Sequence, residues 1–172
     1  MTIARILKQS DIDFFMYYLI YNKKTGKFKL NKNSYIKHKI GKEIGEINWS
    51  GYLIIRLYRK RIMAHRLAYA YVYGVKNMPE QIDHKNCNKS DNRICNLRPS
   101  NKYTNTQNVG LTKSNSSGCK GICWAKTHKM WKAYLYNYNV CFHVGYFKNI
   151  KEAKKAIRKK RTEIHGEFAN HG

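Results

Sequence analysis

The sequence predicts an α+β protein built from small sheets and short helices. Three observations support this fold class: short β-rich runs separated by turn residues, two segments whose apolar residues recur at helical spacing, and the absence of any repeated unit. We expect a β-rich lead-in over residues 1–50, a compact domain over 51–108, a polar linker over 109–117 and a second domain over 118–172.

The lead-in is expected to contain a β-hairpin over residues 17–30. Residues 17–21 are rich in Tyr, Leu and Ile, residues 22–26 supply turn chemistry, and residues 27–30 alternate polar with apolar side chains. Residues 31–50 are basic and interrupted by glycines, and they show no clear period.

The middle region predicts the order strand, helix, strand, loop, strand, helix. Residues 52–58 are β-rich, and Arg59-Lys60 is expected to turn the chain toward Ile62. One apolar helix face follows and stops before Gly74, with its members at Ala64, Leu67, Ala68, Tyr71 and Val72.

A strand over residues 81–84 and a polar loop over 85–93 come next. A second strand lies around residues 96–98 and is expected to end at Pro99. Ser100 then caps a helix that runs to about Asn108.

The last region has a different pattern. After a small-residue stretch at 113–118, it predicts strands at 121–125, 131–136 and 141–147, and a helix that starts at Asn149 and ends at Gly166. Alternation directs Trp131, Ala133, Leu135, Val144 and Phe147 toward that helix.

The net charge of the chain indicates what kind of partner it binds. The chain has 34 Lys and Arg against 10 Asp and Glu, a net charge of +24. Residues 1–117 carry 22 basic and 7 acidic groups, and residues 118–172 carry 12 and 3, so both regions are cationic. A polyanion is the expected partner, and nucleic acid is the first candidate.

Other classes fit less well. The longest apolar run, residues 14–21, is too short for a bilayer, and no secretion signal opens the chain. Five cysteines, an odd number, favour a reducing compartment, and we expect a cytoplasmic protein. A basic protein on a membrane surface is the alternative to a nucleic-acid-binding one.

One constellation suits phosphodiester hydrolysis. Neutral His84 can accept a proton from water, and an amide oxygen such as that of Asn96 can orient its ring. Asp83 and Asn105 offer oxygen ligands suited to Mg²⁺ or Mn²⁺. Because neighbours in a regular strand point to opposite faces, Asp83 and His84 can share one phosphate only where the strand twists or ends.

These residues resemble the HNH homing endonucleases common in phages, in the subgroup whose last motif residue is Asn. The resemblance covers roughly residues 50–108 and rests on His65-Arg66-Leu67, Ile82-Asp83-His84, Asp91-Asn92-Arg93-Ile94-Cys95-Asn96-Leu97-Arg98 and Asn105-Thr106-Gln107-Asn108. It implies a ββα-metal finger in which His84 is the general base, Asn96 orients it, and Asp83 with Asn105 binds one divalent metal per site. It also implies double-stranded DNA as substrate and products with 5′-phosphate and 3′-hydroxyl ends.

The last region resembles the ethylene-response-factor DNA-binding domain, also called the APETALA-two type. The resemblance rests on residues 117–124, 131–135 and 144–147, on Glu152-Ala153 and on Gly166. It implies a three-stranded antiparallel sheet that is packed on one helix and enters the major groove. Several arginines and a tryptophan of the plant domains are replaced here by Cys, His and Tyr, which places the plant target sequence in doubt.

Residues expected to contact DNA fall into two groups. Around the nuclease site they are Lys85, Lys89, Arg93, Arg98, Lys102 and Asn108, and on the second domain they are Lys120, Lys126, Lys132, Tyr134, Tyr136, His143 and Tyr146. Arg93 and Arg98 are candidates to hold phosphates of the cleaved strand; the alternative is that Arg93 and Asn92 brace the long loop through hydrogen bonds. We expect Asn105 and Asn108, three residues apart on a helix, to face one groove.

Several alternatives stay open. A zinc site is one alternative, with four potential ligands at Cys119, Cys123, Cys141 and His143. Their spacing is not that of structural zinc sites, and we expect no bound zinc. Trp124, Trp131 and Phe147 are expected in the core.

The rival functions are a non-catalytic DNA-binding protein and a sequence-indifferent nuclease. A monomer on DNA is expected, and a double-strand cut requires a dimer or two successive events.

Overall fold

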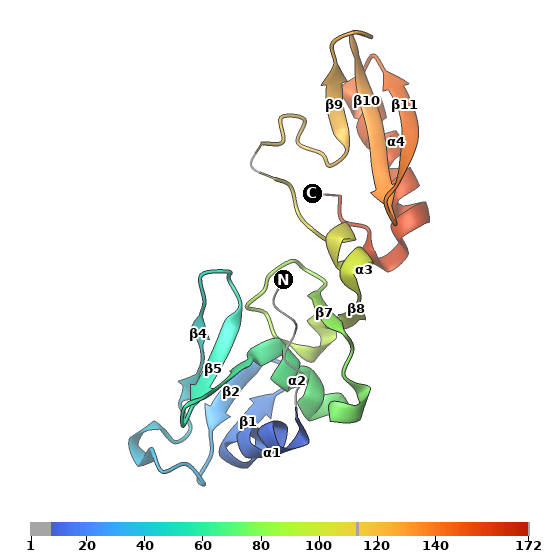
Figure 1. Ribbon diagram of the computed structural model, residues 1–172. Helices are drawn as coiled ribbons and strands as arrows, with labels where there is room; N and C mark the ends of the chain where they lie inside the picture. The colour runs from blue at the N-terminus through green and yellow to red at the C-terminus, as the bar shows by residue number, and fades with distance from the viewer. Residues whose placement is uncertain (1–7, 113, 172) are drawn as a thin grey trace. The chain divides into compact units, whose positions relative to one another are not determined.

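The computed structural model describes residues 8–112 and 114–171. The first seven residues of the expected lead-in, Lys113 of the expected linker and Gly172 lie outside the described residues. The described residues form a mixed α+β structure with several small antiparallel sheets and four α-helices (Figure 1). The chain divides between Ser100 and Asn101 into two compact units. Within the described residues, no helix is long and apolar enough to cross a membrane.

The first unit begins with a helix that the sequence pattern did not predict. Helix α1 (Gln9–Tyr18) precedes strand β1 (Leu19–Asn22), so Tyr17 and Tyr18 end a helix instead of starting a strand. The physical reason is spacing: Ile12, Phe15 and Leu19 lie on one side of the chain and are almost fully buried. The tyrosine-rich run has high β propensity, but burial of this face outweighs it.

The expected hairpin follows. Strand β1 pairs antiparallel with β2 (Lys27–Leu30), and β2 pairs with β3 (Glu43–Ile44). A second sheet contains β4 (Glu46–Ile47), β5 (Leu53–Leu57) and β6 (Lys60–Met63). The β5–β6 turn is formed by Tyr58 and Arg59, with φ of 46° and 66°, so it lies one residue earlier than expected. Positive φ at both central residues is the geometry of a tight two-residue hairpin.

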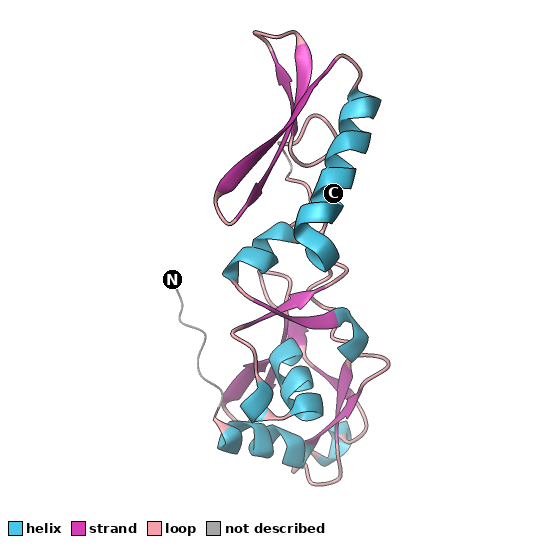
Figure 2. Cartoon of the chain, turned by 90° about the vertical axis from the view of Figure 1, so that its right-hand side faces the viewer, coloured by secondary structure: helices cyan, strands magenta, loops and turns pink. Residues whose placement is uncertain are grey.

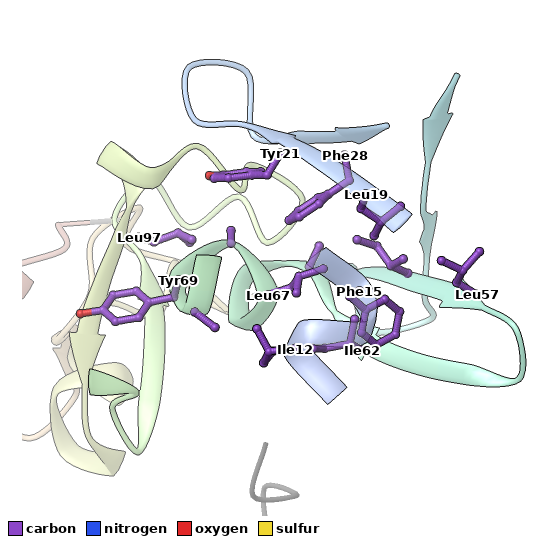
Figure 3. Packing of buried hydrophobic residues seen from close by; sticks show 14 of the residues in the cluster. Ile12, Phe15, Leu19, Tyr21, Phe28, Leu57, Ile62, Leu67, Tyr69 and Leu97 are labelled. Carbon is purple, nitrogen blue, oxygen red and sulfur yellow. The ribbon is translucent and has the colours of Figure 1, made fainter. Parts of the chain in front are cut away.

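Helix α2 (Ala64–Tyr73) ends at Gly74, as predicted. Its Leu67 and Ala68 are buried in a core that gathers α1, β1, β2, β5 and β6. Figure 3 shows Leu67 between Ile12 and Phe15 on one side and the β1–β2 ribbon on the other. This core holds α2 firmly, which matters because α2 supplies His65 to the site described below.

Strands β7 (Gln81–His84) and β8 (Leu97–Ser100) form a two-stranded antiparallel sheet after α2. Pro99 lies inside β8 opposite Ile82, so it does not end the strand. Proline is tolerated there because β8 has a partner on one side within this sheet. Helix α3 (Lys102–Gln107) is capped by Asn101, not Ser100, and the Asn101 side chain accepts hydrogen bonds from the Tyr103 and Thr104 amides.

The second unit contains the predicted three-stranded sheet and helix. Strands β9 (Ile122–Ala125), β10 (Met130–Asn137) and β11 (Val140–Phe147) pair antiparallel in the order β11-β10-β9. Helix α4 (Ile150–His165) runs along one face of this sheet (Figure 2), and Asn149 caps it. The core between them contains Ala133, Leu135, Ala153 and Ile157.

A β-bulge explains one irregularity of β11. Ala133 pairs with Gly145 and Tyr134 with His143, which leaves Val144 without a partner in the register. The extra residue shifts the alternation by one position. Val144 and Phe147, three residues apart, therefore both pack on the core side, as expected from the sequence.

Candidate functional site

His84 ends β7 in a buried position. Its side chain is 4% exposed, and its Nε2 lies 3.3 Å from the amide oxygen of Asn92. Asn92 is itself 1% exposed, and its Nδ2 donates to the Ser90 carbonyl at 3.0 Å. Both side chains are therefore held in one orientation by the fold, which is what a general base requires.

Two aromatic rings complete the surroundings of His84. The His65 ring meets the His84 ring edge to face at 5.3 Å, and the Tyr52 ring lies 6.0 Å from His84 and 5.3 Å from His65. The Lys89 ammonium lies over the Tyr52 ring at 4.9 Å. His65 belongs to the stretch on which the resemblance to HNH endonucleases rests, whereas the sequence pattern did not indicate Tyr52.

Burial controls the charge of both histidines. It lowers the pKa of His84, against an opposing effect of the Asn92 hydrogen bond, and the Lys89 charge lowers that pKa further. Burial lowers the pKa of His65 to about 3, with smaller contributions from His84 and Arg66. Both rings are thus neutral near pH 7, and a neutral imidazole is the form that can accept a proton.

Asp83 forms a buried ion pair. Its Oδ2 accepts from Nε of Arg98 at 2.8 Å and lies 2.7 Å from Nη2, and both side chains are 7% exposed. The register explains the pairing, because Asp83 lies directly opposite Arg98 on the neighbouring strand. We expected Arg98 to hold a phosphate; in the structure its guanidinium lies on the Asp83 carboxylate.

Asn96 ties the loop between the two strands together. Its Oδ1 accepts from the Asn86 amide at 3.0 Å, and its Nδ2 donates to Asn86 Oδ1 at 3.0 Å and to the Asp91 carbonyl at 2.8 Å. We expected Asn96 to orient the His84 ring. The amide oxygen found beside that ring belongs to Asn92, and the hydrogen bonds of the Asn96 side chain run to the loop backbone and Asn86.

The same loop is braced by Arg93. Its Nε donates to Asp91 Oδ1 at 2.8 Å and its Nη2 to Oδ2 at 2.6 Å. The hydrogen bond from Arg93 is the largest cause that lowers the pKa of Asp91 to about 2. Of the two roles considered for Arg93, bracing the loop is the one that this geometry supports.

The β1–β2 hairpin supports the loop from the other side, which the sequence pattern did not indicate. The Tyr21 hydroxyl donates to the Asn92 carbonyl at 2.7 Å, and the Ile94 amide donates to the Lys23 carbonyl at 3.3 Å. Gly26, with φ of 73°, approaches so closely that a Cβ there would lie 2.4 Å from the Arg93 nitrogen. The turn signal was visible in the sequence, but its contact with residues far along the chain was not.

Two further expected DNA contacts have structural partners. Asn108 is 6% exposed, and its carbonyl accepts from Nδ2 of Asn170 at 2.8 Å. Lys120 donates to the carbonyls of Gln107, at 2.9 Å, and Val109, so its ammonium lies at the carboxyl end of α3. Positive charge there is favourable to the helix, which explains the lysine without a nucleic acid. Asn105 is partly exposed and does not share the burial of Asn108.

The remaining expected DNA contacts are accessible. Lys85, Lys89 and Lys102 are exposed on the loop and at the start of α3. The outer face of the β9–β11 sheet, on the side away from α4, carries Lys132, Tyr134, Tyr136, His143 and Tyr146, with Lys126 in the adjoining turn. Rings stack on this face, because His128 lies 4.3 Å from Tyr146 and nearly parallel to it.

The tryptophans divide between core and surface. Trp131 packs against the core of the second unit as expected, whereas Trp124 is 48% exposed and meets Trp131 edge to face at 5.2 Å. Trp124 pairs with Trp131 near the end of the sheet. The expectation that Trp124 is a core residue was therefore wrong, because the core does not extend to this end of the sheet.

The oxygen donors of the site fit a hard divalent cation only in part. Within the described residues, no group of three His, Cys, Asp or Glu could hold a metal ion. Asp83 offers a carboxylate, whose several lone pairs can accept from Arg98 and still bind a cation. Asn105, the other expected ligand, lies on α3 in the second unit.

Comparison with known proteins identifies the class of this site. Residues 63–107, which contain His65, Asp83, His84, Asn92 and Asn96, match the family model described as HNH endonuclease. The chain is also 33% identical to Protein 3.8 of Escherichia phage T7 over 88 residues, which are 51% of this chain and 72% of that protein. The chain therefore belongs to the same family as Protein 3.8 of phage T7, and its residues 63–107 form a region of the HNH endonuclease type. No solved structure matches the chain significantly.

Proposed function

We propose that the protein is a metal-dependent, site-selective DNA endonuclease of the homing type. The observation that carries the proposal is the His84 side chain, a buried neutral imidazole whose ring lies against the Asn92 amide oxygen within the nuclease-family region. A nuclease acts on nucleic acid, and the net charge of +24 supports a polyanionic substrate.

His84 is proposed as the general base. It takes a proton from the water that attacks the phosphorus, and the Asn92 oxygen, which accepts from the ring, stabilises the imidazolium that forms. His65 and Tyr52 exclude water from two sides of the ring. Asn96 contributes indirectly, because it fixes the loop that carries Asn92.

Asp83, together with Asn105, is proposed to hold one Mg²⁺ or Mn²⁺, as the resemblance to a ββα-metal finger implies. When bound, the ion neutralises charge on the leaving oxygen. His84 is the last residue of β7 and Asp83 precedes it. The strand therefore ends at the point where the side chains of Asp83 and His84 have to approach one phosphate. The expected products carry 5′-phosphate and 3′-hydroxyl ends.

The charged surfaces are proposed to hold double-stranded DNA. Lys85, Lys89 and Lys102 contact phosphates near the cleaved bond, and the outer face of the β9–β11 sheet acts as an ethylene-response-factor-like domain. Residues 109–117 serve as the linker between the two regions. One site per chain cuts one strand, so a monomer nicks DNA and a double-strand cut requires a dimer or two events.

One observation favours a second candidate, a DNA-binding protein without catalysis. The Arg98 guanidinium neutralises the charge of the Asp83 carboxylate, which weakens its attraction for a metal ion. The two candidates differ in one measurable property, which is phosphodiester cleavage in the presence of a divalent metal.

The test is cleavage of supercoiled plasmid libraries with Mg²⁺ or Mn²⁺ by the wild type and by His84→Ala, with the exposed His38→Ala as a matched control. We expect discrete nicked or linear products from the wild type and from His38→Ala. His84→Ala should be at least about 100-fold slower, the usual contribution of a general base. Equal cleavage by His84→Ala would exclude His84 as the base. A smear would indicate a sequence-indifferent nuclease, and binding without cleavage would favour the second candidate.

A further inference from the structure

The turn between β4 and β5 presents an unusual apolar tip. Trp49 is 98% exposed and Ile47, two residues before it, is 64% exposed. A tryptophan normally buries 150–250 Å² or so of its surface, and leaving it in water forgoes that stabilisation. Figure 1 shows this turn at the free end of the β4–β5 hairpin.

The turn is rigid despite its exposure. The Asn48 side-chain oxygen accepts from the amides of Ser50 at 3.0 Å and Tyr52 at 2.9 Å. The Asn48 amide donates to the Tyr52 carbonyl at 2.9 Å, which closes the loop. Gly51 adopts a φ of 84°, a conformation that glycine allows at little cost. The Trp49 backbone is therefore held in place, so the ring does not need to be ordered from a flexible loop on binding.

The turn is also joined to the active site. Lys89 Nζ donates to the Ser50 carbonyl at 3.2 Å and lies 4.9 Å from the centre of the Tyr52 ring. That ring lies 6.0 Å from the ring of His84. Trp49 precedes Ser50 directly, so the tip of the turn adjoins the group of side chains, Lys89 and Tyr52, that leads to His84.

The charges around the tip favour a nucleic acid over a protein surface or a second copy of the chain. Lys89 contacts the turn, and Lys85 of the same loop is also exposed. Three acidic groups of this unit are paired with arginines, Glu46 with Arg56, Asp83 with Arg98 and Asp91 with Arg93. A rigid apolar ring beside cations matches the side chains that enter a minor groove and separate adjacent base pairs.

We propose that Trp49 is a wedge that inserts at one base step of duplex DNA close to the phosphate that His84 attacks. The proposal rests on the proposed nuclease function for the position of the cleaved bond. Opening the step bends the duplex and brings the backbone toward a histidine that is itself too buried to move outward. Trp49 would thereby contribute to the choice of the DNA sequence that is cleaved, because base-pair steps of different sequence differ in how easily they unstack.

The first experiment follows base unstacking without cleavage. Duplexes that contain the cleavage site carry 2-aminopurine at one position each, and they are bound by full-length His84→Ala or by His84→Ala with Trp49→Ala. We expect a fluorescence increase at one step near the cleaved bond with Trp49 present and none with Trp49→Ala. No increase at any step with Trp49 present would overturn the wedge.

The second experiment uses rescue. On fully paired duplex, Trp49→Ala should cleave about 10- to 100-fold more slowly, because the wedge no longer offsets the cost of unstacking the step. On a duplex with a mismatch at that step, cleavage should return to within about threefold of the wild type, because the step is already opened. Trp49→Phe should retain an intermediate rate, and Trp124→Ala, an exposed tryptophan of the second unit, serves as the control.

The outcomes separate the two proposals. Equal cleavage of paired duplex by wild type and Trp49→Ala, or a loss that the mismatch does not rescue, would refute the wedge while leaving the nuclease intact. Loss of a dimer in sedimentation on Trp49→Ala would assign the tip to contact between copies and would also refute it. If the wild type cuts no DNA, the nuclease proposal fails, and the aminopurine signal on random-sequence duplexes still decides the wedge.

Discussion

The His84 pocket and the outer face of the β9–β11 sheet place polar groups in opposite environments. In the pocket, Asp83, His84, Asn92 and Asn96 are buried, with at most 7% of each residue exposed, and they are hydrogen-bonded to other parts of the fold. On the sheet, Tyr136 and Tyr146 are 58% and 38% exposed. Disturbing the pocket should therefore change stability and chemistry together. Changes on the sheet face should alter binding while stability stays constant.

The comparison also distinguishes two roles of basic side chains, ion pairing within the fold and exposure to solvent. Arg93 and Arg98 have carboxylate partners inside the first unit, and they stabilise the chain that carries the site. Lys126 and Lys132 lie on the second unit's sheet and adjoining turn, in reach of solvent. Net charge alone does not distinguish these roles, because a basic residue counts equally in both.

The largest expected effect is on the contact between the β1–β2 turn and the active-site loop. Gly26→Ala would place a Cβ 2.4 Å from the Arg93 nitrogen and 2.6 Å from the Asn92 carbonyl carbon. The backbone that holds Asn92 must then shift. We expect a loss of about 3 kcal/mol or more in the free energy of unfolding, measured with urea, and a marked loss of cleavage.

Gly41→Ala is the matched control for this change. Its φ of 76° is close to the 73° of Gly26, but nothing lies within 4 Å of the added Cβ. It should lose only about 1 kcal/mol, the cost of the backbone conformation itself. Equal losses for the two variants would show that the hairpin does not support the loop.

A smaller effect is expected from pH, through the buried His65. Its pKa in the fold is about 3, below the usual value near 6.5, and it faces His84 from β7 and Tyr52 from the β4–β5 turn. As pH falls below about 6.5, the unfolded state binds a proton that the folded state does not. Stability should therefore fall with decreasing pH, by up to about 1.4 kcal/mol per unit from this group.

His65→Phe keeps a ring of similar shape and removes the titration. Between pH 6.5 and 5 or so, above the range of most carboxylates, its unfolding free energy should depend less steeply on pH than that of the wild type. The exposed His38→Gln should leave the slope unchanged. Parallel curves for wild type and His65→Phe would contradict a buried neutral His65.

The smallest effect tests the sheet face. Lys126→Gln with Lys132→Gln should weaken DNA binding several-fold and reduce the slope of log K against log salt by about 0.9 for each lost phosphate contact. The melting temperature should not change. Lys155→Gln with Lys159→Gln removes the same charge from exposed positions of α4, and it should leave the slope nearly constant. Equal slopes for both pairs would mean that binding depends on total charge alone.

Much of the fold could be predicted because its signals are local. Helix α2 follows from its apolar spacing and Gly74, and the β9–β11 sheet with α4 follows from alternation and the Asn149 cap. Helix α1 was missed because residues 14–21 form a run that suits strand and helix alike. What decided it was the burial of Ile12 and Phe15 against elements distant in the sequence.

The sequence by itself determined the chemical types at the site, since His84, Asp83 and the asparagines around them lie in the region that matches the HNH endonuclease model. It also determined the excess of positive charge. Only the tertiary structure decided which asparagine meets the His84 ring, that Arg98 lies on Asp83, and that Gly26 and Tyr21 support the loop. The physical reason is that local pattern depends on neighbours along the chain. Burial and hydrogen-bond pairing depend on residues that only folding brings together.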